Sequence, residues 1–311
     1  MTALPTTPVR LGTRRSPLAM AQAEEARARL CTAHGWPLNA VEIVPVTASG
    51  DKVLDRPLAE IGGKALWTKE LDQWLHAGEI DFAVHSAKDV ETLRPEWLAI
   101  AAVLEREDVR DVLVGAASLA ELPAGARIGT SAPRRAAQAL HLRPDCRVVS
   151  FRGNVATRLG RLEAGEAEVT LLALAGLNRL GQTEVGTPLA LEGWLSAPGQ
   201  GAIAIECRAD DAAMRALLAA IDHAPSHRAL MAERALLAAL GGNCHSAVGV
   251  HTRSEGADLV LRAAIFSEDG AEKVEGEARF AAGDAAGPAR LAADLLSRAS
   301  GGLAACFDPP R

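Results

Sequence analysis

Three turns rich in glycine or serine place basic residues directly after an expected strand. Their sequences are GTRRSP (12–17), GTSAPRR (129–135) and FRGNVATR (151–158). Such turns, where strands lead into helices, present unpaired backbone N–H groups and the positive end of a helix dipole, and arginine adds a planar two-pronged donor for carboxylate or phosphate. One arginine in a helix's first turn is usually solvated or in a weak surface ion pair. Three such turns together predict a binding site for a polyanion.

An acid and a cysteine could carry reaction chemistry. DFAVHSAKDV places Lys88 and Asp89 directly after an apolar strand, where polar side chains meet a cleft. The pair is either a surface ion pair or a carboxylate that handles developing positive charge. Cys244, in LGGNCHSAVG, lies on an expected loop beside His245. It is either a small buried hydrophobe, as most such cysteines are, or a nucleophile or attachment point.

Nucleotide and metal chemistry fit the sequence less well. There is no GxxxxGK[ST] loop, and GQGAIA (199–204) departs from the dinucleotide fingerprint. His223 and His227 are four residues apart, but Pro225 and Ser226 between them mark a helix start, so helix capping or a surface position is expected rather than metal binding. The five cysteines are far apart and form no CxxC pair, which argues against a disulfide framework and a zinc site.

Composition indicates an ordinary globular protein. With 311 residues, 49% apolar and 23% charged, two or three domains are expected. The net charge of −6 argues against binding to nucleic acid or an anionic membrane. The sequence shows neither a signal-peptide pattern nor an apolar run long enough to span a bilayer, so a cytoplasmic location is expected.

Alternating strands and helices must position these residues. A strand over 9–12 is followed by a helix with Ser16 as N-cap and Pro17 at its first position, closed by Gly35. Further expected elements are a strand over 41–46, a helix over 68–77 and an apolar strand over 81–85. This order predicts an α/β domain with a largely parallel sheet.

The alternation restarts after Glu107 and predicts a second α/β domain. Its expected strands cover 111–114, 127–129, 147–151 and 169–173, and its expected helices 131–140 and 154–164. Residues 201–206 are strand-like again and precede a helix over 211–221. We expect this strand to return to the first sheet, which would create two lobes with a cleft and a hinge.

A third module follows Ser226. Its expected helices cover 227–240 and 286–299, and its expected strands 248–251, 259–266 and 273–280. Helix, antiparallel sheet and helix predict an α+β domain. The predicted domains are therefore residues 1–103 with 201–221, residues 108–197, and residues 224–311.

These segments, in this order, resemble the porphobilinogen deaminase (hydroxymethylbilane synthase) family over essentially the whole chain. The matching stretches are LGTRRSPLA, GDKVLDRPLAEIGGKALWTKEL, DFAVHSAKDV, EREDVRD, GTSAPRR, FRGNVATRL, LALAGLNRLG, APGQGAIAIECR and LGGNCHSAVG. Nine such stretches are far more specific than one motif. The resemblance implies two α/β domains like type II periplasmic binding proteins around a cleft, plus a C-terminal α+β domain that carries a cofactor cysteine.

The resemblance also implies roles for individual residues. Cys244 would hold a dipyrromethane cofactor through a thioether, and Asp89 would be the catalytic carboxylate. The residues expected to bind the cofactor's carboxylates are Ser86, Lys88, Ser131, Arg134, Arg135 and Arg158. Those expected to bind the substrate and the growing chain are Arg14, Ser16, Arg152, Arg179 and Gln200, with Lys64 and Trp67 on a mobile loop over the cleft. No metal is implied.

The implied activity is that of a transferase of haem biosynthesis. Four porphobilinogen molecules would be condensed stepwise with loss of ammonia, and water would then release linear hydroxymethylbilane. Each pyrrole ring bears two carboxylates, so a chain of rings is the polyanion that the arginine turns suit. A carboxylate at Asp89 would stabilise the positive charge that develops as ammonia leaves. The implied partners are porphobilinogen and the elongating polypyrrole. Nothing in the sequence demands more than a monomer.

Some positions depart from the family pattern, and two other function classes remain open. Family members often have serine at Ala132, lysine at Glu60, arginine at Ser49 and phenylalanine at Trp67. A non-catalytic cytosolic anion-binding or sensor protein of the same two-lobed fold would explain the cleft and the arginines, but it would need neither Asp89 nor the loop cysteine. A phosphate or nucleotide-sugar enzyme lacks its motif.

Overall fold

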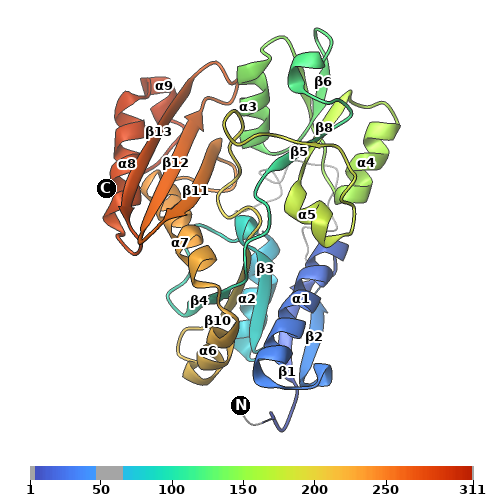
Figure 1. Ribbon diagram of the computed structural model, residues 1–311, viewed down its shortest axis with the longest axis vertical. Coiled ribbons are helices and arrows are strands. Elements are labelled where there is room, and N and C mark those ends of the chain that lie inside the picture. Colours follow the sequence, from blue (N-terminus) through green and yellow to red (C-terminus); the bar gives the residue numbers. More distant parts are fainter. Residues whose placement is uncertain (1–3, 47–65, 310–311) are drawn as a thin grey trace. The chain divides into compact units, whose positions relative to one another are not determined.

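The computed structural model describes residues 4–46 and 66–309 (Figure 1). The chain forms two compact units. Unit 1 comprises Met1–Glu107 and Ala202–His227, and unit 2 comprises Asp108–Gly201 and Arg228–Arg311. Within the described ranges, no helix combines the length and the apolar character needed to cross a membrane.

Unit 1 contains a five-stranded sheet in the order β2-β1-β3-β10-β4. Its strands are β1 (Val9–Arg14), β2 (Val41–Val46), β3 (Phe82–Ser86), β4 (Leu98–Val103) and β10 (Ile203–Arg208). β10 joins this sheet, as predicted, but it runs antiparallel to β3 and β4. The other four strands run in the same direction, so the sheet is largely parallel, as predicted, with β10 as its antiparallel member. β10 arrives from unit 2, without the helical crossover that connects neighbouring parallel strands.

Three helices accompany this sheet: α1 (Pro17–His34), α2 (Leu66–Ala77) and α6 (Ala212–Leu218). Short 3₁₀ turns are η1 (Leu38–Ala40), η4 (Ala87–Asp89) and η6 (Ala219–Ile221). The predicted ends of α1 are confirmed. Ser16 Oγ accepts the N–H of Ala19 at 3.3 Å, and Gly35 closes the helix at φ 70°. Ala26 and Leu30 of α1 pack in one apolar core with Leu11 and Phe82 of the sheet.

The α/β part of unit 2 repeats the same strand order, β7-β6-β8-β5-β9. Its strands are β5 (Asp111–Val114), β6 (Arg127–Gly129), β7 (Arg147–Val149), β8 (Val169–Ala173) and β9 (Thr187–Pro188). β6 lies parallel to β7 and β8, whereas β5 runs antiparallel to β8 and β9. In each unit the antiparallel strand is thus the one that follows the chain's passage from the other unit.

The helices here are α3 (Pro133–Leu142), α4 (Val155–Glu163) and α5 (Leu174–Arg179), with a 3₁₀ turn η5 (Leu119–Glu121). β4, β9 and α5 were not predicted from the sequence. The strand predicted over 147–151 ends at Val149, and Phe151 is fully buried in the following loop. Its ring packs over Gly129, where an added Cβ would lie 2.6 Å from a ring carbon. This close approach brings the GTSAPRR and FRGNVATR turns together.

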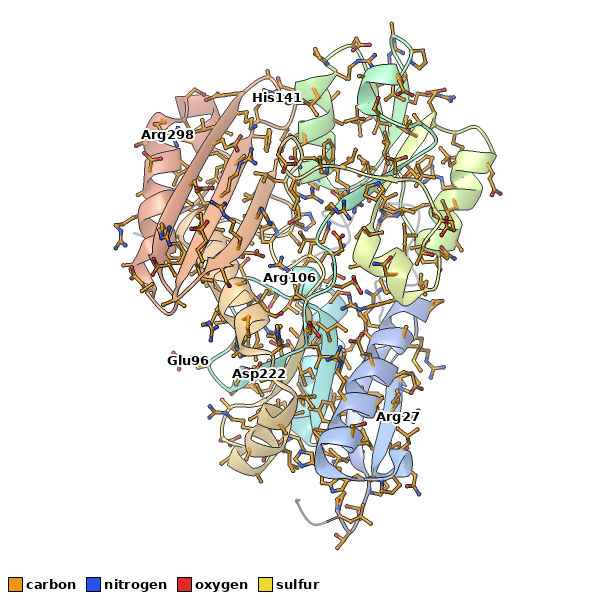
Figure 2. All side chains as sticks on the ribbon, in the orientation of Figure 1. Arg27, Glu96, Arg106, His141, Asp222 and Arg298 are labelled. Carbon is orange, nitrogen blue, oxygen red and sulfur yellow. The ribbon has the colours of Figure 1, made fainter. Side chains whose placement is uncertain are left out.

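The rest of unit 2 is an antiparallel sheet with helices, which confirms the predicted α+β module. Its elements are α7 (Ala224–Ala239), β11 (Val248–Glu255), β12 (Asp258–Phe266), β13 (Lys273–Ala281), α8 (Ala286–Arg298) and α9 (Gly301–Ala304). Figure 1 shows α8 packed along β13. His141 of α3, labelled in Figure 2, bonds through Nδ1 to the carbonyl oxygen of Gly270 at 2.9 Å. The exact division into three domains stays a prediction.

Candidate active site

Unit 1 contains a polar cavity of about 60 Å³ at the ends of β1 and β3. These strands are parallel neighbours, so their carboxyl ends meet at one edge of the sheet. Four predicted site residues line the cavity: Arg14, Ser16, Ser86 and Asp89. The other lining residues are Leu18, Ala19, Gln22, Thr68, Val84 and His85. The predicted residues therefore bring one arginine, two hydroxyls and one carboxylate to a single space.

Two anchors hold the turn that carries Asp89. The backbone N–H of Ala87 donates to the carbonyl oxygen of Ala202 at 3.0 Å. Gln22 Nε2 donates to Ser86 Oγ at 2.9 Å, and the Ser86 hydroxyl lies 3.1 Å from Gln22 Oε1. Asp89 itself is exposed. Sequence reasoning missed Gln22, although a glutamine six residues after the Ser16 cap lies on the same side of α1 as Ala19, and that spacing was a usable signal.

In unit 2, the two arginines of GTSAPRR surround a buried carboxylate. Asp111 is fully buried, and its Oδ2 and Oδ1 lie 2.8 and 2.7 Å from Nη2 of Arg134 and Nη2 of Arg135. The Trp194 indole N–H donates to Oδ2 and the Gln200 amide to Oδ1, each at 2.8 Å. Burial alone would raise the pKa of Asp111, but the two arginines hold it far below its usual range. For these two arginines, the interpretation as surface residues is wrong.

The arginine turns retain hydrogen-bonding capacity in buried places. Arg135 Nε and Arg152 Nη1 are buried and have no acceptor. A buried guanidinium N–H without a partner is costly, and a carboxylate is its natural acceptor. The residues of unit 2 therefore fit a ligand that carries carboxylates.

Of the other predicted residues of unit 2, Arg158 lies in α4, within the FRGNVATR stretch, and Arg179 ends α5. Arg158 Nε donates to the carbonyl oxygen of Gly153, and Arg179 Nη2 to that of Gly201, each at 3.0 Å. Ser131 is exposed just before α3. The helix predicted to start at Ser131 begins at Pro133 instead, because Thr130 Oγ1 accepts the N–H of Ala132 at 3.2 Å and forms a turn there.

Cys244 lies on an exposed loop after α7, as predicted. Asn243 shapes this loop, because its Oδ1 accepts the N–H of His245 at 2.9 Å. All five cysteines lie in the described residues, and none forms a disulfide. Cys31, Cys146 and Cys207 are buried, and burial raises the pKa of each thiol, that of Cys207 to about 11. Only Cys244 and Cys306 are exposed, so they are the candidates for covalent attachment.

Three further positions complete the predicted set. Lys88 is half-buried in η4 and does not line the cavity. Lys64 lies outside the described residues. Trp67 belongs to α2, but its side chain lies outside the described part of the structure.

The two histidines lie at the start of α7, and their rings bond to side chains rather than cap the helix backbone. His223 Nδ1 bonds to Ser226 Oγ, and His227 Nδ1 to Oδ1 of Asp222 (Figure 2), each at 2.8 Å. Among the described residues, no group of three or more His, Cys, Asp or Glu side chains could hold a metal ion.

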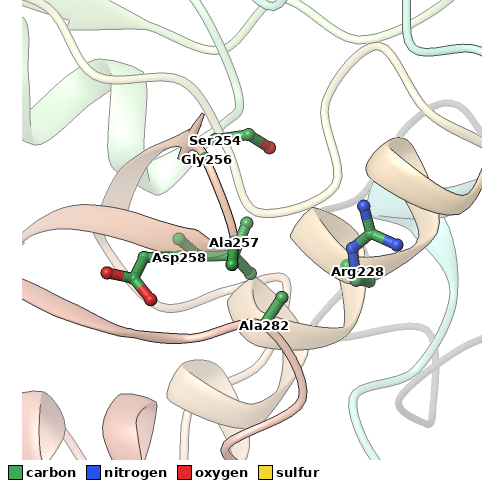
Figure 3. A pocket seen from close by; sticks show the side chains of 7 residues that line it. Arg228, Ser254, Gly256, Ala257, Asp258 and Ala282 are labelled. Atoms are coloured by element: carbon green, nitrogen blue, oxygen red, sulfur yellow. The ribbon is translucent and has the colours of Figure 1, made fainter.

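A second hollow, of about 320 Å³, lies beside the β11–β12 turn in unit 2 (Figure 3). It is lined by Arg228, Ser254, Gly256, Ala257, Asp258, Leu259 and Ala282. Asp258 already forms an ion pair with Arg279 at 2.9 Å. None of the predicted site residues lines this hollow, so it is not the candidate active site.

Comparison with known proteins gives consistent matches along the chain. The family model described as "Porphobilinogen deaminase, dipyromethane cofactor binding domain" matches residues 9–216, and "Porphobilinogen deaminase, C-terminal domain" matches residues 227–297. The porphobilinogen deaminase of Sphingopyxis alaskensis is 61% identical over 281 residues, which cover 88% of this chain and 89% of that protein. The porphobilinogen deaminase of Nitrobacter winogradskyi is 49% identical over 94% of this chain and 93% of that protein. That of Paracoccus denitrificans is 47% identical over 97% of each chain.

Similarity to solved structures is weaker. A TRAP periplasmic solute binding protein from Ochrobactrum anthropi aligns with a TM-score of 0.41 and 11% identity, over 75% of this chain and 77% of that chain. A TM-score this low carries no argument about function. The family models and the sequence identities of 47 to 61% show that the chain belongs to the porphobilinogen deaminase family, whose N-terminal domain binds the dipyrromethane cofactor.

Proposed function

We propose that this chain joins four porphobilinogen molecules, one at a time, on a dipyrromethane cofactor held by Cys244, and then releases linear hydroxymethylbilane. The observation that carries the proposal is the gathering of Arg14, Ser16, Ser86 and Asp89 around one cavity in a member of this family. A non-catalytic anion-binding protein would not need the carboxylate of Asp89 beside an arginine, and nothing among the described residues favours that alternative.

The residues of unit 2 would hold the cofactor. An exposed thiol at Cys244 can form a thioether, whereas the three buried thiols cannot be reached. Arg135 Nε and Arg152 Nη1 offer buried donors to acetate or propionate groups, and Ser131, Arg134 and Arg158 lie on the same turns. When bound, the dipyrromethane would supply the terminal ring carbon to which the first porphobilinogen is joined.

Asp89 would handle charge in each addition. One C–C bond forms between rings, the C–N bond of the aminomethyl group breaks, and the hydrogen displaced from the ring carbon ends on the released ammonia. Positive charge develops on the incoming ring as ammonia leaves, and a fixed carboxylate stabilises it. Arg14 and Ser16, at the same cavity, would bind the ring's own carboxylates and so orient it.

Arg179, Gln200, Lys88, Lys64 and Trp67 keep the roles that the family resemblance implies, as part of this proposal. Gln200 is buried and donates to Asp111, which supports a role in orienting the arginines rather than in direct contact with substrate. We further propose a cytoplasmic monomer that binds no nucleic acid, which the net charge of −6 supports.

The test is the intact mass of the purified protein and of two serine variants. The wild-type protein should carry the added mass of two pyrrole units. Cys244→Ser should lack that mass and show no turnover, because the oxygen does not form the thioether. Cys306→Ser is the matched control, since Cys306 is the other exposed cysteine, and it should keep both the mass and the activity. An active wild-type protein with a bare Cys244 would refute the proposal.

A further inference from the structure

A buried charge cluster in unit 1 involves residues that the proposed mechanism does not use. Arg94 lies at its centre: Nε and Nη2 donate to the two carboxylate oxygens of Glu206, each at 2.9 Å. Nη1 and Nη2 also donate to Asp72, at 3.1 and 2.6 Å. The side chain of Glu206 is 0% exposed, that of Arg94 7% and that of Asp72 14%. The cluster joins β10, α2 and the loop before β4.

This cluster carries an excess of negative charge. One guanidinium directly contacts two carboxylates, and the carboxylate of Glu91 lies 3.5 Å from Arg94 Nη1. Burial would lower the pKa of Arg94, but Asp72 and Glu206 raise it above its usual value, so the guanidinium stays charged. Buried charges that are not fully paired act strongly on their neighbours, because little water screens them.

His85 connects this cluster to the cavity. His85 pairs with Ala204 across the β3–β10 ladder, so Glu206, two residues further along β10, lies on the same face of the sheet. His85 Nε2 is 3.3 Å from Glu206 Oε2, but it is buried and makes no hydrogen bond of good geometry. The same histidine lines the cavity together with Asp89.

The charged groups around His85 come from several elements. Burial lowers its pKa; Glu206 of β10 raises it, Arg94 lowers it, and Asp72 of α2 and Asp89 of η4 raise it. Arg14 of β1 lines the same cavity. The net result is a lowered pKa, so the imidazole is neutral at neutral pH.

We propose that His85 is a positioning residue of the active site: as a neutral side chain it packs in the cavity wall and keeps Asp89 in place. Behind it, the linked side chains of Glu206, Arg94 and Asp72 hold His85 in position. Protonation would draw the ring toward Glu206, because its carboxylate belongs to a cluster in which one guanidinium, Arg94, is shared between two carboxylates. It would also place a positive charge in the wall of a cavity that stabilises positive charge. This inference rests on the proposed function, because only that function gives the cavity this task.

The test compares pH profiles of kcat for three proteins whose cofactor loading has been verified by intact mass. In the wild type, kcat should fall only at a pH lower than about 6.5, the ordinary pKa of histidine, because burial lowers the pKa of His85 in the folded protein. In His85→Gln, this fall of kcat at low pH should be absent. At pH 8, kcat of this variant should be about tenfold lower than that of the wild type with an unchanged KM, as expected when a catalytic group is displaced.

His34→Gln is the matched control. His34 is as buried as His85, at 7% exposure, and lies in the same unit, but it bonds to the carbonyl oxygen of Leu217 and does not line the cavity. This variant should keep the wild-type acid limb. A histidine with a merely structural role would give the same profile shape in all three proteins.

Two further variants test in which direction the acid limb of the kcat profile moves when a nearby carboxylate is removed. Glu206→Gln removes a charge that raises the pKa of His85, so the acid limb should move to lower pH. Asp72→Asn, at the more exposed edge of the cluster, should move it in the same direction by less, and it serves where Glu206→Gln or His85→Gln does not fold. An acid limb that is unchanged in these variants at normal loading overturns the role of His85 alone. A bare Cys244 in the active wild-type protein overturns the proposed function instead.

Discussion

In unit 1 a single guanidinium, Arg94, contacts the carboxylates of Asp72 and Glu206, whereas in unit 2 a single carboxylate, Asp111, contacts the guanidiniums of Arg134 and Arg135. Both clusters are buried beside sheets of the same strand order. One sheet is thus associated with an excess of negative charge and the other with an excess of positive charge. The first suits a cavity that stabilises a cation, and the second suits binding of carboxylates.

The two sheets are otherwise built alike at this edge. In each, one strand carries or ends on a Gly-Thr pair, Gly12-Thr13 in β1 and Gly129-Thr130 at the end of β6, and the following helix begins with a proline. Topology therefore places a turn and a helix start at the same position in both sheets. The charge that collects there depends on a few side chains, several of them supplied by distant segments.

The largest effect is expected from Asp89→Asn, which removes the carboxylate of unit 1 that faces the cavity. Turnover should fall by about 10²- to 10⁴-fold, the usual contribution of such a group, while cofactor loading stays normal. Intact mass should show enzyme–substrate complexes that form but do not proceed. Asp81→Asn is the control, since Asp81 pairs with Arg10 and does not line the cavity. Normal turnover in Asp89→Asn would contradict the assignment of cation stabilisation to unit 1.

Asp111→Asn should have the next largest effect, and on stability. It leaves two buried guanidiniums without their anion, a change that costs about 3 to 5 kcal/mol. Urea unfolding followed by tryptophan fluorescence would measure it, because Trp194 donates to Asp111. Asp145→Asn, which removes an exposed partner of Arg143, should change stability much less. Equal urea midpoints for Asp111→Asn and Asp145→Asn would mean that the burial of the Asp111 cluster does not increase its contribution to stability.

Acid should destabilise the two units over different pH ranges. His85 has a lowered pKa when folded, so the unfolded chain binds the extra proton and unit 1 loses stability as the pH falls below about 6.5. Asp111 also has a lowered pKa when folded, so the stability that it contributes is lost only as the pH falls below about 4. Hydrogen exchange at about pH 5, resolved by peptide, should show loosening in unit 1 before unit 2. The opposite order would contradict these assignments.

The smallest effect on stability is expected from alanine substitution of Gly129 and Gly12, the glycines of the two Gly-Thr pairs. An added Cβ at Gly129 would lie 2.6 to 2.7 Å from ring carbons of Phe151, so Gly129→Ala should cost about 1 to 3 kcal/mol. At Gly12 the added Cβ would meet Ile80 Cδ1 at 2.3 Å, the flexible end of a side chain that can move aside. Gly12→Ala should therefore cost less in urea unfolding. A larger loss at Gly12 would show that the edge of unit 1 is the more rigid one.

Local elements could be predicted closely from the sequence. The strands over 41–46, 111–114, 127–129 and 169–173 have the predicted ends, and Ser16, Pro17 and Gly35 bound α1 as expected. These features depend on caps, turns and periodicity within a few residues. The candidate site was predictable as far as it follows such turns, and Arg14, Ser16, Ser86 and Asp89 do line one cavity.

The partners of buried charges were not predictable in this way. Nothing near Arg94 indicates that it bonds Glu206, which is 112 residues away, and nothing near Arg134 and Arg135 indicates Asp111. The sequence by itself determined which turns carry cations, where α1 begins and ends, and which thiol lies on a loop. Only the tertiary structure decided which carboxylates meet which guanidiniums, because burial and strand order, not neighbouring residues, bring such groups together and strengthen their interaction.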